Sequence, residues 1–124
     1  MRGLVFAVFA IALSSAPALA CDGDLMQSSA VNAPEARIQF EPPQISQPFA
    51  VRVALCDGGQ VLTVDAIMPA HQHGMLYRPS MSALGQSRYI AENLVFHMPG
   101  LWHIQVQAEV DARRIDYVYE TVVQ

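Results

Sequence analysis

Residues 68–75, with the sequence MPAHQHGM, place two histidines and two methionines within eight positions of a chain that has four histidines in all. In an extended segment, residues two apart point to the same side at about 6.5 to 7 Å. His71, His73 and Met75 can therefore share one side, and Gly74 accepts the positive φ that would curl the chain inward. Two imidazoles and a thioether form a borderline-soft donor set suited to a copper ion, whereas zinc more often recruits a thiolate or a carboxylate.

A second group of soft donors follows about twenty residues later. His97 and Met98 precede the tight turn Pro99-Gly100. If this turn and the first segment meet at one end of the domain, His97 or Met98 could complete the site. His103 ranks last as a ligand, because it alternates with the apolar Trp102 and is expected on the outer surface of a strand.

A purely structural role for the same residues stays open. Histidine in a turn often satisfies backbone carbonyls through its ring N–H, and methionine commonly fills gaps in a core. On that interpretation Met68 and Met98 pack beneath a loop that the histidines order.

The strands that are expected to position these side chains are short runs of alternating apolar and polar residues, separated by turn residues. The run 48–56 alternates clearly, and so does 101–110, whose inward positions are Trp102, Ile104, Val106, Ala108 and Val110. Further strands are predicted at 36–41, 60–68, 87–92, 93–98 and 115–123. About seven short strands, without a long helical period, predict an all-β protein: an immunoglobulin-like antiparallel β-sandwich.

The N-terminus predicts a secretory signal peptide over residues 1–20. Arg2 precedes an apolar run at 4–13, and the small-x-small pattern of residues 18–20 ends the segment. A run of about ten apolar residues is roughly half of what a bilayer-spanning helix needs. We therefore expect one mature domain, residues 21–124, in the periplasm or the external medium and without a transmembrane segment.

The two cysteines, Cys21 and Cys56, form an even count, which favours a disulfide in an oxidising compartment. An alternative makes Cys21 a lipid-modified N-terminus, because it directly follows the apolar segment. Ala18 argues against lipidation, since bacterial lipoprotein signals usually carry a large aliphatic residue there.

Charge and composition exclude several functions. Without Arg2, six Arg oppose eleven Asp or Glu, which gives 6 − 11 = −5 for residues 21–124 with neutral histidines. Such an acidic chain is a poor partner for nucleic acid or anionic membranes. There is no lysine, no nucleophile-elbow serine and no paired carboxylates, so no enzyme is predicted.

The histidine segments also resemble a known family. The stretches DAIMPAHQHGM, YRP and YIAENLVFHMPGLWHIQV are similar to the YtkA-like domain family, which is related to FixH-type proteins. The resemblance spans residues 49–110, and its motif positions are Met68, Pro69, His71, His73, Gly74, Phe96, Met98, Pro99, Gly100 and Trp102. It implies an exported immunoglobulin-like sandwich, and the FixH-type relatives suggest copper handling and cytochrome oxidase assembly. The chain departs from FixH-type members because no retained transmembrane helix is expected in it.

Together these features predict an exported protein that binds a metal ion, most simply copper, through the histidine segment. The alternative is a non-enzymatic accessory module that binds another periplasmic or membrane-bound protein, with the segment purely structural.

Overall fold

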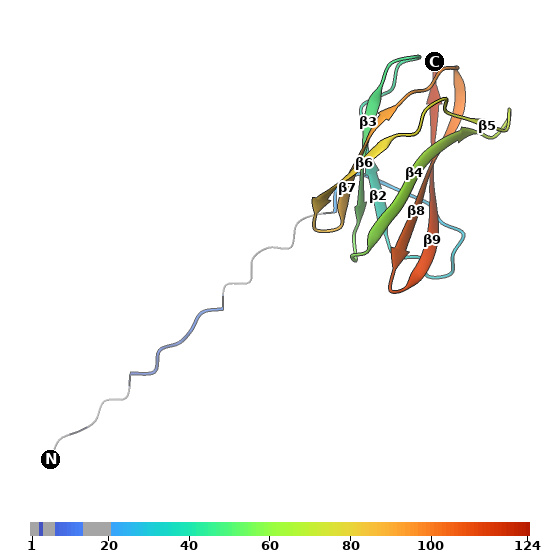
Figure 1. Ribbon diagram of the computed structural model, residues 1–124. Helices are drawn as coiled ribbons and strands as arrows, with labels where there is room; N and C mark the ends of the chain where they lie inside the picture. The colour runs from blue at the N-terminus through green and yellow to red at the C-terminus, as the bar shows by residue number, and fades with distance from the viewer. Residues whose placement is uncertain (1–2, 4–6, 14–20) are drawn as a thin grey trace.

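The computed structural model describes residues 3, 7–13 and 21–124. The predicted signal peptide therefore falls largely outside the described residues, including its cleavage site. The remaining chain is all-β (Figure 1). Its strands are β1 (Asp24–Leu25), β2 (Ala36–Gln39), β3 (Phe49–Leu55), β4 (Gln60–Met68), β5 (His73–Gly74), β6 (Ser80–Gly85), β7 (Arg88–Leu94), β8 (Gly100–Val110) and β9 (Arg113–Val123).

Within the described part of the chain the strands form two antiparallel sheets. One has five strands in the order β1-β2-β3-β7-β6, and the other has four in the order β5-β4-β8-β9. Both sheets contribute to a single hydrophobic core, with Val51 and Val53 from the first and Ala66 and Ile104 from the second. None of the described segments forms an apolar helix of membrane-spanning length.

Strict alternation of apolar residues explains the best-predicted strands. All five inward positions predicted in β8 are buried. In β3, Val51, Val53 and Leu55 are buried as expected, and Phe49 is half-buried, but Ala54 on the opposite face is buried as well. In β9, Ile115 and Tyr117 are buried and Tyr119 on the same face is half-buried. Because these strands carry the core, they fix which loops meet at each end of the sheets.

The prediction of two strands at 87–92 and 93–98 is wrong. A single strand, β7, spans Arg88–Leu94, and the predicted break between Glu92 and Asn93 is a β-bulge opposite β3, with Asn93 at φ 66°. Asparagine tolerates the left-handed region better than most residues, so the strand continues through the irregularity. Residues 95–98 are an ordered connection without strand pairing, and they carry His97.

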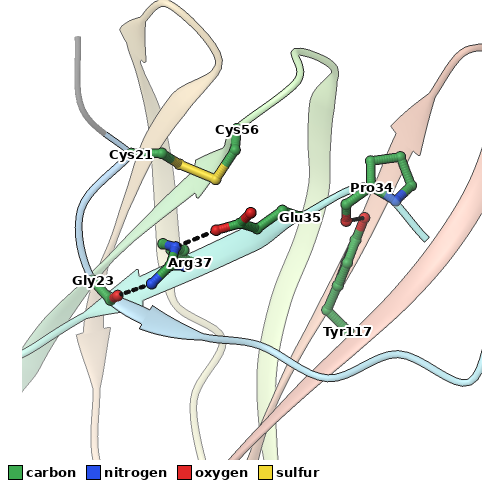
Figure 2. The surroundings of a disulfide bond; sticks show 7 residues. All are labelled: Cys21, Gly23, Pro34, Glu35, Arg37, Cys56 and Tyr117. Carbon is green, nitrogen blue, oxygen red and sulfur yellow. Dashed lines mark hydrogen bonds and ion pairs between the residues drawn. A yellow bond between two sulfur atoms is a disulfide. The ribbon is translucent and has the colours of Figure 1, made fainter. Parts of the chain in front are cut away.

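The disulfide is formed, and it fixes residue 21 to the end of β3. Cys21 and Cys56 are joined with a Cα–Cα distance of 5.5 Å, and Arg37 next to them contacts Glu35 and donates to the Gly23 carbonyl at 2.9 Å (Figure 2). This confirms the pairing predicted from the even count. A sulfur engaged in a disulfide cannot carry a thioether-linked lipid, so lipidation of Cys21 is incompatible with this structure.

After β1, the N-terminal arm, residues 26–34, crosses to the edge of the four-stranded sheet. Gln27 exchanges two backbone hydrogen bonds with Val118 of β9, at 2.9 and 2.8 Å. The Tyr117 hydroxyl donates to the Pro34 carbonyl at 2.6 Å, and burial raises the pKa of this phenol (Figure 2). The Tyr119 hydroxyl donates to Asp24 Oδ2 at 2.7 Å, and this hydrogen bond raises the Tyr119 pKa. The arm therefore covers the open side of β9.

Candidate metal centre

The first histidine segment is a hairpin turn. β4 ends at Met68 and β5 begins at His73, and the two residues are cross-strand partners. The His71 N–H donates to the Met68 carbonyl at 3.2 Å, which places Pro69 second in a β-turn, where its fixed φ is favoured. Gln72, at φ 52°, then turns the chain into β5.

The expectation of an extended segment curled at Gly74 is therefore wrong. The positive φ belongs to Gln72, and Gly74 lies in β5 opposite Ile67. Glycine at this position serves close packing instead, because a Cβ added there would lie 3.3 Å from the Ala66 carbonyl oxygen.

Three histidine side chains gather at this end of the sheets. The ring centroids of His71 and His73 are 5.7 Å apart, and those of His73 and His97 are 5.4 Å apart. His73 shares the inner side of its sheet with Met68, because directly paired residues point to the same face. The hairpin and the 95–99 connection thus meet, as the sequence made possible, and His97 joins the first pair.

Trp102 forms the inner wall of this histidine cluster (His71, His73 and His97). Its ring lies 5.6 Å from His97 and 6.4 Å from His73, both edge-on, and Phe96 stacks on it at 4.5 Å. The indole Nε1 donates to the Met98 carbonyl at 3.0 Å. The sequence predicted Trp102 as a core anchor but gave no signal that it would touch two imidazoles, because that contact depends on how the loops close.

Hydrogen bonds fix the connection that carries His97 at the residue before the histidine and at the residue after it. The Ser46 N–H donates to the Phe96 carbonyl at 2.8 Å, and Trp102 holds the Met98 carbonyl. His97 is half-buried, and its Nδ1 atom is buried without a hydrogen-bonding partner among the described residues. A buried polar atom left without a partner costs about 1 to 3 kcal/mol, so its presence calls for an explanation.

The three histidine rings are not tied to the backbone by hydrogen bonds among the described residues. Within the described part of the chain, no backbone carbonyl accepts a hydrogen bond from the three rings, and none of them pairs with a carboxylate. The turn is instead ordered by its own backbone hydrogen bond and by Pro69. A neutral imidazole has one nitrogen lone pair, so three imidazoles that are not engaged elsewhere can act together as metal ligands.

The spacing of the rings fits a shared ion only in part. Two imidazoles bound to one ion at about 2 Å have centroids about 5 to 6 Å apart, and the distances from His73 to His71 and from His73 to His97 fall in this range. The rings of His71 and His73 are stacked, however, at 27°. Among the described residues, no group of three or more His, Cys, Asp or Glu side chains is already arranged to hold a metal ion.

The methionines predicted as ligands lie beside the core. Met75 and Met98 are partly buried and pack against it, and Met68 is 2 % exposed. Met68 lies close to Gly100, where an added Cβ would be 3.0 Å from its Cε atom. Burial of Met68 and partial burial of Met98 agree with the packing role considered for them.

His103 is separate from the cluster. It alternates with Trp102 on β8 and lies on the outer side of the four-stranded sheet, as predicted. Its Nε2 atom lies 3.0 Å from Glu120 Oε1 but, like His97 Nδ1, is buried without a hydrogen bond among the described residues. Its side chain is only 23 % exposed, so it is less accessible than a free surface histidine. This position makes His103 a suitable control for experiments on the cluster.

Comparison of the chain with protein-family models, with curated proteins and with solved structures finds no match.

Proposed function

We propose that this protein is an exported copper-binding protein whose ion is held by His71, His73 and His97, with Met75 and Met98 as the nearest thioethers in sequence. The observation that carries the proposal is the meeting of three imidazoles at 5.4 and 5.7 Å, one of them with a buried nitrogen that has no partner in the described chain. An ion would satisfy that nitrogen and offset its desolvation.

The chemistry of the surroundings favours copper over harder ions. Imidazole suits copper in both oxidation states, and thioether sulfur favours the reduced ion, whereas magnesium and calcium require oxygen ligands. No carboxylate or thiolate joins the three imidazoles: the nearest acid to a histidine among the described ion pairs is Glu120, on His103. Each ligand must be neutral to coordinate, so protons compete with the ion and affinity falls on acidification.

The fold family and the cellular compartment are part of the same proposal. The two antiparallel sheets and the motif resemblance support an immunoglobulin-like sandwich of the YtkA-like type. The Cys21–Cys56 disulfide supports an oxidising compartment, the periplasm or the external medium. The FixH-type proteins that the motifs resemble suggest copper handling, and this is the class of function that the histidine cluster would serve.

Copper titration followed by Trp102 fluorescence tests the proposal directly. The chain has a single tryptophan, and its ring lies 5.6 Å from His97 and 6.4 Å from His73, so an ion bound in the cluster is expected to quench its emission strongly. We expect quenching to saturate at one ion per chain, and the ion to remain after desalting. Quenching should reverse as the pH is lowered.

Histidine variants distinguish copper binding in the histidine cluster from non-specific copper binding. The double variant His71→Ala/His73→Ala is expected to lose saturable quenching and retained copper, whereas His103→Ala is expected to keep both. The titration is made with copper(II) and, under reducing conditions that leave the disulfide intact by mass, with copper(I). Equal copper retention by the double variant and the wild type would refute the site. Failure of both ions to bind the wild type would refute the metal function.

The alternative proposal is that the histidine cluster holds no ion. In that case the protein is an accessory module that binds another exported or membrane-bound protein, and the hairpin is one of its surface loops. A wild-type chain that ignores copper but copurifies with one defined partner would support this function.

A further inference from the structure

The four edges of the two sheets are protected to very different degrees. β1 is an edge strand of only two residues. β5 is equally short and covers only the last two residues of β4, so β4 itself forms the rest of that edge. There the Ala66 N–H donates to Asp65 Oδ1 at 2.8 Å, and the charged Asp65 lies on the edge strand. The third edge, β9, is long but is covered in its middle, where Val118 exchanges backbone hydrogen bonds with Gln27. Short strands and covering segments are the usual means by which proteins prevent edge-to-edge association. The fourth edge, β6, has neither protection.

β6 presents an open and uncharged pairing surface. All six residues from Ser80 to Gly85 are exposed, and none of them is charged. β7 pairs with one side of the strand, and no backbone hydrogen bond of the described residues reaches its other side. A bulge between Ala83 and Gly85 and the preceding Pro79 limit the regular edge to residues 80–83. Backbone groups of an edge strand point alternately to its paired and its open side, so every second one of these four residues carries a free backbone donor and acceptor for another strand.

Exposed apolar side chains concentrate around the same strand. Within residues 21–124, half of the large exposed hydrophobic side chains fall in the ten-residue segment 76–85; they are Leu76, Tyr77, Met81 and Leu84. Leu76 and Tyr77 are more than 70 % exposed. A strand edge flanked by such residues gains both backbone hydrogen bonds and apolar burial when it is paired.

We propose that β6 is the interface of a homodimer, in which two copies of this chain pair their β6 strands antiparallel about a twofold axis. The occupant is a second copy because the strand is self-complementary. Like charges placed opposite one another on paired strands are destabilising, and this uncharged strand brings none together even though residues 21–124 carry a net charge of −5. The regular edge is short, so the dimer is weak and depends on concentration.

Symmetry restricts how the two strands pair. Directly opposite residues of antiparallel strands lie on the same face of a sheet. A twofold axis perpendicular to the sheet therefore passes between equivalent residues, and within the regular edge these are either the two Met81 or the two Ser82 residues. In both registers the two Ser82 side chains are direct or diagonal neighbours.

The interface is independent of the proposed metal centre. Antiparallel pairing of β6 directs the two histidine hairpins toward opposite ends of the dimer, so neither copy completes the cluster of the other. Each outcome of the copper titration is therefore compatible with either oligomeric state, and the two proposals fail separately.

Sedimentation of the purified protein with its disulfide intact tests the interface. We expect the wild type to shift from monomer to dimer as its concentration rises, and Ser82→Lys and Ser82→Glu each to remain monomeric over the same range. An equal mixture of the two variants should regain the dimer, because opposite charges then meet across the axis. Ser29→Lys adds the same charge at an exposed position of the N-terminal arm and should dimerise like the wild type.

Thermal unfolding of all variants serves as the folding control, and unchanged midpoints are expected because position 82 is exposed. A wild type that stays monomeric at the highest concentrations would overturn the proposal. A dimer equally strong in the wild type, Ser82→Lys and Ser82→Glu would overturn it as well, because association would then involve another surface.

Discussion

Trp102→Ala is expected to lower the free energy of unfolding by about 3 to 5 kcal/mol, the range typical of removing a buried aromatic side chain. Trp102 is 0 % exposed, stacks on Phe96 and contacts the edges of His73 and His97. Its removal also leaves the Met98 carbonyl without its indole donor. Ordinary domains are stable by only about 5 to 15 kcal/mol, so this is a large fraction of the total.

Urea unfolding followed by far-UV circular dichroism measures this effect, since the variant has no tryptophan to report by fluorescence. Leu101→Ala is the matched control: Leu101 neighbours Trp102 on β8 but is 39 % exposed on the other side of the strand. We expect the control to cost about 1 kcal/mol or less. A loss below about 1 kcal/mol for Trp102→Ala would contradict the central packing role of the indole.

The Cys21→Ser/Cys56→Ser double variant is expected to lose about 3 to 4 kcal/mol of unfolding free energy. The disulfide closes a loop with a sequence separation of 35, and in the chain-entropy model a loop of this length restricts the unfolded chain by that amount. The native state loses little else, because β2 continues to pair with β3 and the Cys56 N–H still donates to the Glu35 carbonyl.

Reduced wild-type protein provides the control for this variant. If the loss comes from the cross-link, the reduced wild type and the double variant should unfold at the same urea concentration, below that of the oxidised protein. Equal stability of the oxidised and reduced wild type would show that the unfolded chain is already compact between residues 21 and 56.

Much of the fold could be predicted from the sequence, because a strand with one buried face alternates apolar and polar residues. β4 and β8 were predicted nearly to the residue. β6 was missed because the sequence SMSALG alternates over four residues only, from Ser80 to Ala83, and lies after a loop rich in turn residues. The structure exposes every residue of this strand, so no core contact selects its pattern. The bulge at Asn93 was mistaken for a strand end, since turn-forming residues occur in both.

The histidine cluster could be predicted only in part. The proximity of His71 and His73 follows from their spacing, but the approach of His97 depends on the pairing of β4 with β8 and on the course of residues 95–99. Such contacts are tertiary, and no local pattern specifies them. The same holds for Trp102, whose burial was evident from alternation although its neighbours were not.

The two parts of the histidine cluster differ in local stability. The connection bearing His97 is tied to the interior by the hydrogen bonds of Ser46 to Phe96 and of Trp102 to Met98, whereas β5 pairs with β4 over two residues only. Backbone amides at the hairpin should therefore exchange with solvent at a lower opening free energy than those beside His97. An ion bound between them would be released by fraying of the hairpin alone, while both sheets remain folded.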